Sequence, residues 1–453
     1  MKAHLTSCLN KVKADYAEIR YEEIQATQIH YVGKELERIG EWERKGGGIR
    51  TKIKGGWSFV SFNDLENLEK NLELAMKQAH LLKRGRIKLA PVPPHDEIVS
   101  LDLRKDPRRI SLEEKHFLMS RYNQILLSPQ YIQTSDLKYA DVHTTKYFVN
   151  SEGTYIQQEK VDMVLGMAAI ARKDDNIQTA HEGIGGTGGY ELVEGREKEA
   201  EEVSRRALSL LNAEPFPGGK YTIIVDPKLA GIFAHEAFGH LSEADFLYEN
   251  KRLASIMRLG RVFGPEELDI IDEAPIKGEG GYYLYDDEGV AAGKTHLIRQ
   301  GKLVRRLHSR ETAAKMGEEP TGNARAMSYQ HPPIVRMSNT YIAPRGKTLE
   351  EMIDEVEEGL YVKGFRGGET NLEMFTFSPE EGYIIEKGKL GKKARDINLT
   401  GNIFTTLSNI DAIGKDLVLS TGSGGCGKGA QYPLPVATGG PHLRIKDVVV
   451  GGR

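Results

Sequence analysis

The sequence predicts an α+β protein, with an N-terminal α/β portion of two small strand-plus-helix units and a larger β-rich C-terminal domain. Two observations predict this class. Strand-favouring segments are twice followed by a helical pattern in the first half of the chain, and glycine turns interrupt a strand-rich second half. Because 453 residues are too many for one hydrophobic core, we expect domains at 1–90, 91–215 and 216–453.

The first unit combines short antiparallel strands with one helix. Residues 47–60 alternate and turn at glycines, as antiparallel strands do. Asp64 can cap a helix that runs to about residue 82, because Leu68, Leu72 and Ala75 fall on one face at helical spacing.

The second unit follows a polar, proline-containing connector over 90–107. Ser111, with two glutamates shortly after it, begins a helix to about residue 127. Strands are expected at 141–150 and 153–159, joined by a tight turn as in a hairpin. A charged helix is then expected over 196–211.

Composition excludes several classes of protein. The formal net charge is -3 and the pI is about 6.5, which gives no electrostatic reason to expect nucleic acid or a membrane as a direct partner. The two cysteines, Cys8 and Cys426, are too few for a disulfide framework and are typical of a reducing compartment. No secretion signal and no run of ~18 apolar residues is present. We therefore expect a cytoplasmic protein.

A pair of histidines is the first chemical signal. Residues 221–225 form a compact strand pattern, and Asp226, followed by proline, is an N-cap signal for the next helix. This helix carries His235, Glu236 and His240. Two histidines with a glutamate directly after the first are typical of zinc hydrolases, in which imidazoles bind Zn²⁺ and the carboxylate accepts a proton.

The spacing of this motif is HExxxH, which a regular helix does not accommodate. Side chains five residues apart point ~140° apart around an α-helix, against ~40° for a spacing of four. Either the histidines are ordinary capped or solvated residues, or a one-residue π-bulge near Gly239 brings both onto one face. The spacing alone leaves both alternatives open.

A glycine-rich stretch, residues 420–429, contains Cys426. On such a loop a thiolate can bend toward a metal, although this stretch taken alone favours an ordinary free cysteine in a turn. Residues 422–428 also match the GxxxxGK pattern of phosphate-binding loops. Gly429 replaces the Ser or Thr that binds Mg²⁺, and the prolines that follow cannot open a helix, so we do not expect nucleotide binding.

A second glycine cluster, GIGGTGG at 183–189, contains a GxGxxG match. It does not follow a convincing strand and does not open a helix, as a dinucleotide site would require. We expect a flexible loop there.

The sequence resembles the TldD/PmbA family of cytoplasmic metallopeptidases, also described as candidate modulators of DNA gyrase. Four blocks in the same order carry this resemblance. They are HEAFGHLSEAD (235–245), EEPTGNARAMSYQHPPIVRMSNTYI (318–342), GLYVKGF (359–365) and SGGCGKGAQYPLPVATGGPHLRIKDVVVGG (423–452).

The resemblance implies a ligand set and an assembly. This chain keeps His235, Glu236, His240 and Cys426, and so resembles the catalytic TldD-type branch. The implied site is a Zn²⁺ ion held by the two histidines and the cysteine, with Glu236 as the general base. The implied substrates are unfolded or small peptides, and the implied assembly is a homodimer or a heterodimer with a metal-less sister subunit.

Four further residues are weaker candidates. Tyr329 or His331 could stabilise the oxyanion of a tetrahedral intermediate, or could be structural polar residues. Glu243 and Asp245 could hydrogen-bond a ligand imidazole, or could only cap the end of the helix.

Two functions are compatible with these residues. The first is a zinc-dependent endopeptidase or peptidase, and the alternative is a non-catalytic binding or modulator protein, related to gyrase, with a structural zinc. A structural zinc site usually has four protein ligands, whereas a catalytic site keeps one position open. Three ligands beside a free glutamate favour the hydrolase.

Overall fold

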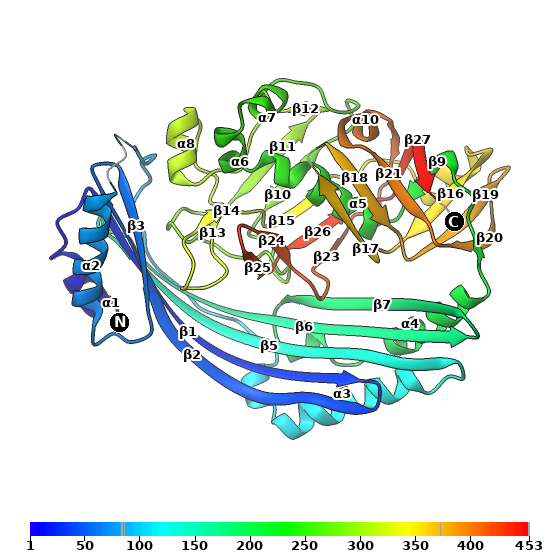
Figure 1. Cartoon of the computed structure of the whole chain (residues 1–453), viewed down its shortest axis with the longest axis horizontal. Helices are drawn as coiled ribbons and strands as arrows, with labels where there is room; N and C mark the ends of the chain where they lie inside the picture. Colours follow the sequence, from blue (N-terminus) through cyan, green and yellow to red (C-terminus); the bar gives the residue numbers. More distant parts are fainter. Residues whose placement is uncertain (83–84, 86, 372, 452–453) are drawn as a thin grey trace.

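A long, curved antiparallel sheet forms the N-terminal half of the molecule, and the C-terminal half lies against its concave face (Figure 1). This computed structural model describes residues 1–82, 85, 87–371 and 373–451. Gly452, at the end of the fourth motif block, lies outside them. Among the described residues, no helix combines the length and apolar character needed to cross a membrane.

The curved sheet has seven strands. They are β1 (Tyr16–Val32), β2 (Glu35–Ile53), β3 (Gly56–Phe62), β4 (Asp96–Val99), β5 (Ile132–Asn150), β6 (Tyr155–Lys173) and β7 (Asn176–Thr187). The order is β3-β2-β1-β5-β6-β4, and β7 also pairs with β6. Because β1 pairs with β5 along its length, the two strand-plus-helix units share a single sheet.

Helices cover the convex face of this sheet. They are α1 (Lys2–Leu9), α2 (Leu68–Leu81), α3 (Leu112–Leu127) and α4 (Glu197–Leu211). Alternate residues of β6, such as Met163 and Leu165, point into the core beneath α3 and α4. The residues between them point to the concave side, as the two-residue period of a strand requires.

Several expectations for this half are confirmed. Ser111 forms a capping box with Glu114 at the start of α3, and the hairpin between β5 and β6 turns at the expected place. The segment 90–107 is mostly irregular, but it contributes β4, which pairs with β6 in parallel.

The expected flexible loop at 183–189 is wrong for residues 183–187, because they continue strand β7. The glycines serve close packing. A Cβ atom on Gly183 would lie 2.5 Å from the backbone nitrogen of Ser423, and one on Gly185 would lie 2.4 Å from the backbone oxygen of Gly422. The loop around residue 422 therefore rests directly on the sheet backbone.

The C-terminal half contains two larger sheets and two short ribbons. The ten-stranded sheet contains β8 (Glu214–Pro215), β9 (Gly219–Val225), β16 (Glu358–Lys363), β17 (Gly367–Asn371), β18 (Met374–Ser378), β19 (Glu381–Glu386), β20 (Lys389–Arg395), β21 (Asn398–Asn402), β22 (Ile410–Ile413) and β27 (Leu443–Gly451). The six-stranded sheet contains β10 (Ile270–Glu273), β11 (Lys294–Arg299), β12 (Lys302–Leu303), β15 (Asn339–Ile342), β23 (Val418–Ser420) and β26 (Ala437–Gly440). The ribbons pair β13 (Ala324–Arg325) with β14 (Ile334–Val335), and β24 (Cys426–Lys428) with β25 (Gln431–Leu434).

The helices of this half are α5 (Pro227–Ala234), α6 (Ala244–Glu249), α7 (Lys251–Ile256), α8 (Arg310–Met316), α9 (Leu349–Asp354) and α10 (Ile403–Ser408). Strand β9 lies between β16 and β27 inside the ten-stranded sheet, and α5 leaves its end. The mixture of helices and several sheets confirms the α+β class.

We predict that Gly185→Ala destabilises the protein. The new methyl group meets a backbone oxygen that cannot rotate away, so we expect a loss of about 1–3 kcal/mol in the free energy of unfolding, measured by urea titration. Gly293→Ala is the matched control, because a Cβ atom there meets nothing within 4 Å. Equal stability of the two variants would contradict the packing argument.

Candidate metal centre

The helix that carries both histidines begins at Asp226, whose side chain is held by two hydrogen bonds. The side chain of Asp226 accepts a hydrogen bond from the backbone N–H of Leu229 at 2.9 Å, which confirms the expected N-cap. Its other oxygen accepts the N–H of Gly364, just beyond β16. The start of α5 is therefore tied to the central strands of the ten-stranded sheet.

The helix widens at the motif. Residues His235–Gly239 form one π-helical turn, in which the N–H of His240 donates to the carbonyl of His235, five residues earlier. The two imidazole rings consequently lie on the same side, with their centroids 5.1 Å apart and their planes at 80°. The π-bulge alternative is confirmed.

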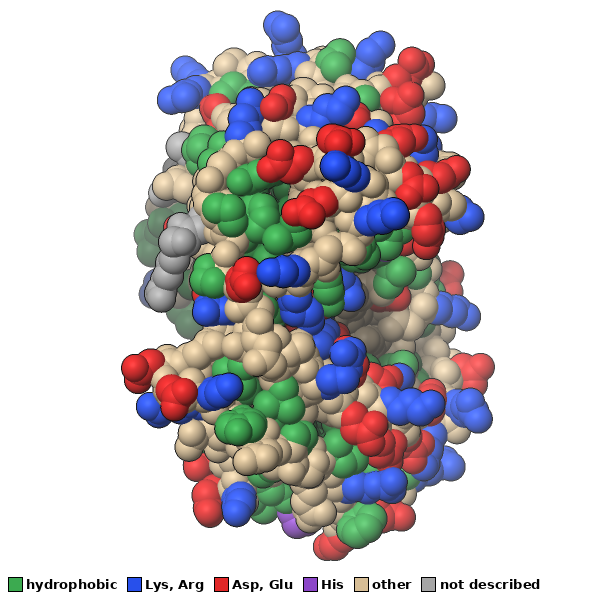
Figure 2. Space-filling model, turned by 90° about the vertical axis from the view of Figure 1, so that its right-hand side faces the viewer, with side chains coloured by type: hydrophobic (Ala, Val, Ile, Leu, Met, Phe, Trp, Pro, Cys, Tyr) green, Lys and Arg blue, Asp and Glu red, His purple; other side chains and the backbone are tan. Residues whose placement is uncertain are grey.

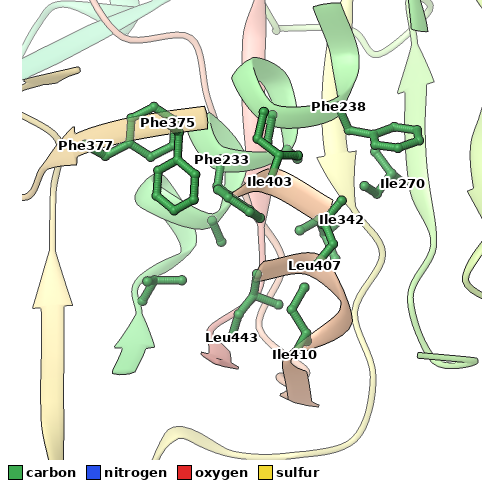
Figure 3. Packing of buried hydrophobic residues seen from close by; sticks show 14 of the residues in the cluster. Phe233, Phe238, Ile270, Ile342, Phe375, Phe377, Ile403, Leu407, Ile410 and Leu443 are labelled. Atoms are coloured by element: carbon green, nitrogen blue, oxygen red, sulfur yellow. The ribbon is translucent and has the colours of Figure 1, made fainter. Parts of the chain in front are cut away.

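Gly239 permits this turn to pack where it does. A Cβ atom at this position would lie 2.0 Å from the sulfur of Met337, so only glycine lets the widened turn approach that side chain. On the opposite face, Phe233 and Phe238 point into the main core, where the ring of Phe233 packs 5.4 Å from that of Phe375 (Figure 3). The turn is therefore held on both sides.

Cys426 comes to the histidines from the far end of the chain. It begins β24, and its Sγ atom lies 3.4 Å from Nε2 of His240. One ligand atom from each of His235, His240 and Cys426 lies within 4.8 Å of the other two. The structure thus gathers the three residues that the sequence singled out as metal ligands.

The chemistry of the three donors fits a divalent metal ion. Around a tetrahedral zinc ion, nitrogen and sulfur ligands lie about 3.6 Å from each other, close to the Cys426–His240 distance. Nδ1 of His235 is buried and makes no hydrogen bond with any described residue. Burial would raise the pKa of the Cys426 thiol, but the two imidazoles lower this pKa to about 5. The cysteine is therefore a thiolate, its metal-binding form, at neutral pH.

A buried ion-pair network orients His240. The Oε2 atom of Glu243 lies 3.1 Å from Nδ1 of His240 and 3.0 Å from the ammonium of Lys428. Lys428 also donates to Asp245 at 2.6 Å. Glu243 thus contacts the imidazole of His240, which is the first of the two roles proposed for it. Asp245 is linked to this imidazole only through Lys428 and Glu243. The ring is held with Nε2 facing Cys426.

Lys428 is the lysine of the phosphate-loop-like pattern. Its side chain is only 7% exposed, and its ammonium lies 4.3 Å from the centre of the Phe246 ring. The lysine contributes to the support of the site.

Glu236 stays outside the three-residue cluster and lines the same cavity. The side chain is half-buried, and its Oε2 atom lies 3.5 Å from the hydroxyl of Thr370 on β17. A carboxylate next to the ligands, but not among them, is free to exchange a proton with a molecule in the cavity.

The cavity itself has a volume of about 330 Å³ and is lined by both halves of the molecule. His181, on β7 of the curved sheet, and Lys228, on α5, are two lining residues that the sequence did not single out. Nδ1 of His181 lies 3.2 Å from Glu380, and Lys228 pairs with Glu182 at 3.0 Å. Lys228 lies two helical turns before His235 and so shares its face of the helix. Only the tertiary packing brings His181 here, so no local pattern could have indicated it.

Tyr329 and His331 are not among the residues that line this cavity. The hydroxyl of Tyr329 donates to the side chain of Asn63 at 2.8 Å, and the imidazole of His331 contacts Ser328. Both sit where the block 318–342 packs on the curved sheet. Their positions support the structural alternative that was considered for them.

We predict that Gly239→Ala weakens both folding and metal binding, because the methyl group collides with Met337. The expected cost is about 1–3 kcal/mol in the free energy of unfolding, with a lower metal content after dialysis. Adding Met337→Ala removes the collision, so the double variant should lose less stability than the two single variants summed. Strict additivity would show that the contact does not constrain the turn.

Comparisons with known proteins identify the family to which this chain belongs. Residues 17–81, 105–211 and 218–452 match domain 1, the central domain and the C-terminal domain of PmbA/TldA metallopeptidases. A metalloprotease of Synechocystis is 45% identical over 97% of this chain and 95% of its own. A zinc metalloprotease TldD homolog of Saccharolobus solfataricus is 31% identical over 97% of each chain.

The fold is also similar to that of a solved structure. A proposed modulator of DNA gyrase from Bacteroides thetaiotaomicron superposes with a TM-score of 0.80, covering 100% of this chain and 99% of its own at 19% identity. The matches span all three domains and both halves of the metal site. The chain therefore belongs to the PmbA/TldD family of metallopeptidases.

Proposed function

We propose that this chain is a zinc-dependent peptidase that hydrolyses unfolded or small peptides. The observation that carries the proposal is the arrangement around the π-turn. His235, His240 and Cys426 supply three donors suited to Zn²⁺, and Glu236 lies free beside them in the same cavity. The names of the metalloprotease relatives support the same reaction.

The residues of the chain would divide the chemistry among them. Zn²⁺, when bound, supplies a Lewis acid that polarises the scissile carbonyl and acidifies water. The carboxylate of Glu236 takes a proton from the attacking water and passes it to the leaving nitrogen. Glu243 fixes the orientation of His240, as hydrogen-bonded carboxylates do for metal-ligating histidines.

The shape of the cavity supports a preference for unfolded chains. The cavity beside the metal ligands is also lined by the glycine-rich residues 420–427 and by His181 and Gly183 of the curved sheet, so elements from both halves line the approach. Figure 2 shows one face of the molecule, with its surface hollowed between the two halves. An extended segment can enter such a space, whereas a folded domain is too wide.

The alternative is a non-catalytic modulator with a structural zinc. A closed structural site needs a fourth protein ligand, and the cluster found among the described residues has three. Positive and negative side chains are interspersed on the face in Figure 2, which gives no electrostatic support for direct nucleic-acid binding. A homodimer or a heterodimer with a sister subunit, and a cytoplasmic location, stay predictions.

We predict that Glu236→Gln separates metal binding from hydrolysis. Glutamine keeps the size of the side chain but cannot accept the proton, so turnover should fall by about 10² or more while zinc content is unchanged. His240→Ala is the comparison variant and should lose zinc and activity together. Near wild-type hydrolysis by zinc-loaded Glu236→Gln would refute the assigned general base and favour the modulator.

We also predict that removing the metal abolishes hydrolysis reversibly. Chelation followed by dialysis should give a protein without peptidase activity, and stoichiometric Zn²⁺ should restore it. Because the metal binds the folded state, it should also stabilise the protein. The free energy of unfolding should be about 2.7 kcal/mol lower for the metal-free protein than for the protein at a free Zn²⁺ concentration of 100 times the Kd. Full activity of a protein shown to be metal-free would exclude the proposed chemistry.

A further inference from the structure

A second cavity, of about 630 Å³, lies between the concave face of the curved sheet and the C-terminal half. Strands β1, β2, β5 and β6 form its floor, and residues 282–287, 325–328 and 432–435 form the other walls. Ser423, Gly424 and Tyr432 line this cavity and also the metal cavity. The two spaces are therefore neighbours, divided by one glycine-rich loop and one tyrosine.

Most charged side chains that line the second cavity already have hydrogen-bond or ion-pair partners, and Arg44 lies over the ring of Trp42. Lys160 pairs with Asp162 at 2.8 Å, and Lys146 pairs with Asp287. Arg325 donates to the backbone oxygen of Pro435 at 2.7 Å. A charged ligand would have to displace these partners, so the cavity does not favour one.

Much of the remaining lining is apolar or aromatic, beside uncharged polar residues such as Thr144 and Gln158. The apolar and aromatic lining residues include Ile24, Trp42, Val142, Val164, Tyr282 and Pro433. Val142 and Val164 are half-buried, although their neighbours Met163 and Leu165 on the other face of the sheet are fully buried. The concave face thus keeps apolar surface that the described residues leave partly uncovered, and burying that surface under a ligand is favourable.

The wall of this cavity is linked directly to a proposed metal ligand. In the ribbon of β24 and β25, Cys426 is the cross-strand partner of Leu434, and Leu434 lines the second cavity. The buried guanidinium of Arg336 holds the same ribbon through the carbonyls of Cys426 and Gln431. A group seated in the second cavity therefore contacts the element that carries the thiolate.

We propose that the second cavity binds apolar side chains of the peptide on one side of the scissile bond, while the metal cavity holds that bond. The proposal rests on the peptidase function and names its substrate class: peptides with an apolar or aromatic segment at a fixed distance from the cleaved bond. The volume lies within the range of roughly 300–1,000 Å³ that is typical of binding sites, so a short segment can be accommodated.

The first experiment compares hydrolysis of three fluorogenic peptides by the zinc-loaded chain. One is short enough to occupy only the metal cavity, and two are extended, with either Leu and Phe or Ser and Gly in the extension. We expect the apolar extension to raise kcat/KM at least tenfold over the polar one, as burial of apolar side chains requires. Equal kcat/KM for both extended peptides would overturn the proposal.

Variants that fill the second cavity with a larger side chain test whether the preference for the apolar peptide arises there. Val142→Trp on β5 and Val164→Trp on β6 should each lower kcat/KM for the apolar peptide about tenfold and leave the short peptide within twofold. Arg38→Trp is the matched control, because Arg38 is exposed on β2 and does not line the cavity. Equal losses for the short and the apolar peptide would overturn the assignment.

A binding measurement separates this proposal from the peptidase function. The chain has two tryptophans, of which Trp42 lines the cavity and Trp57 packs on Tyr16. A dansyl-labelled apolar peptide should quench the tryptophan fluorescence, and Trp42→Phe should remove the quenching. Quenching without hydrolysis would support the cavity and refute the peptidase, whereas absence of Trp42-dependent quenching would overturn the cavity proposal.

Discussion

One backbone hydrogen bond, from the N–H of His240 to the carbonyl of His235, decides the geometry of the metal centre. In an uninterrupted α-helix the two imidazoles would point about 140° apart, and no single ion could contact both. A π-turn interrupts the regular hydrogen bonds of the α-helix, so contacts with surrounding residues must stabilise it. These contacts come from Phe233 and Phe238 in the core and from Gly239, which lets Met337 pack against the turn.

The second part of the centre depends on this turn. Once His240 is placed, its Nδ1 meets Glu243 and its Nε2 meets Cys426. Glu243 is fully buried, and a buried charge is costly unless it is paired. Lys428 pairs with it from the ribbon that begins at Cys426, so the same ribbon delivers both the thiolate and the compensating charge. This coupling explains why two segments almost 200 residues apart form one rigid centre.

Local chemistry in the sequence predicted the local parts of this structure. The caps at Asp226 and Ser111 and the π-turn follow from residues within a few positions of one another. Gly183 and Gly185 could not be interpreted in the same way, because they are required by contact with Gly422 and Ser423 across the domain interface. The sequence did not indicate His181 either, because strand β7 of the curved sheet brings this residue to the metal cavity through a long-range contact. The pairing of β1 with β5, which merges the two expected units into one sheet, is likewise a long-range contact.

The curved sheet is therefore part of the candidate active site as well as the scaffold beside it. Its glycine-bearing edge supports the loop that precedes Cys426, and His181 supplies a wall of the metal cavity. Its concave side chains form the floor of the second cavity. The metal ligands and most residues that line the metal cavity belong to the C-terminal half, and His181 and Gly183 of the curved sheet close one side of it. Under the proposed function, the packing of the two halves would exclude folded domains, and the second cavity would add a preference for apolar side chains.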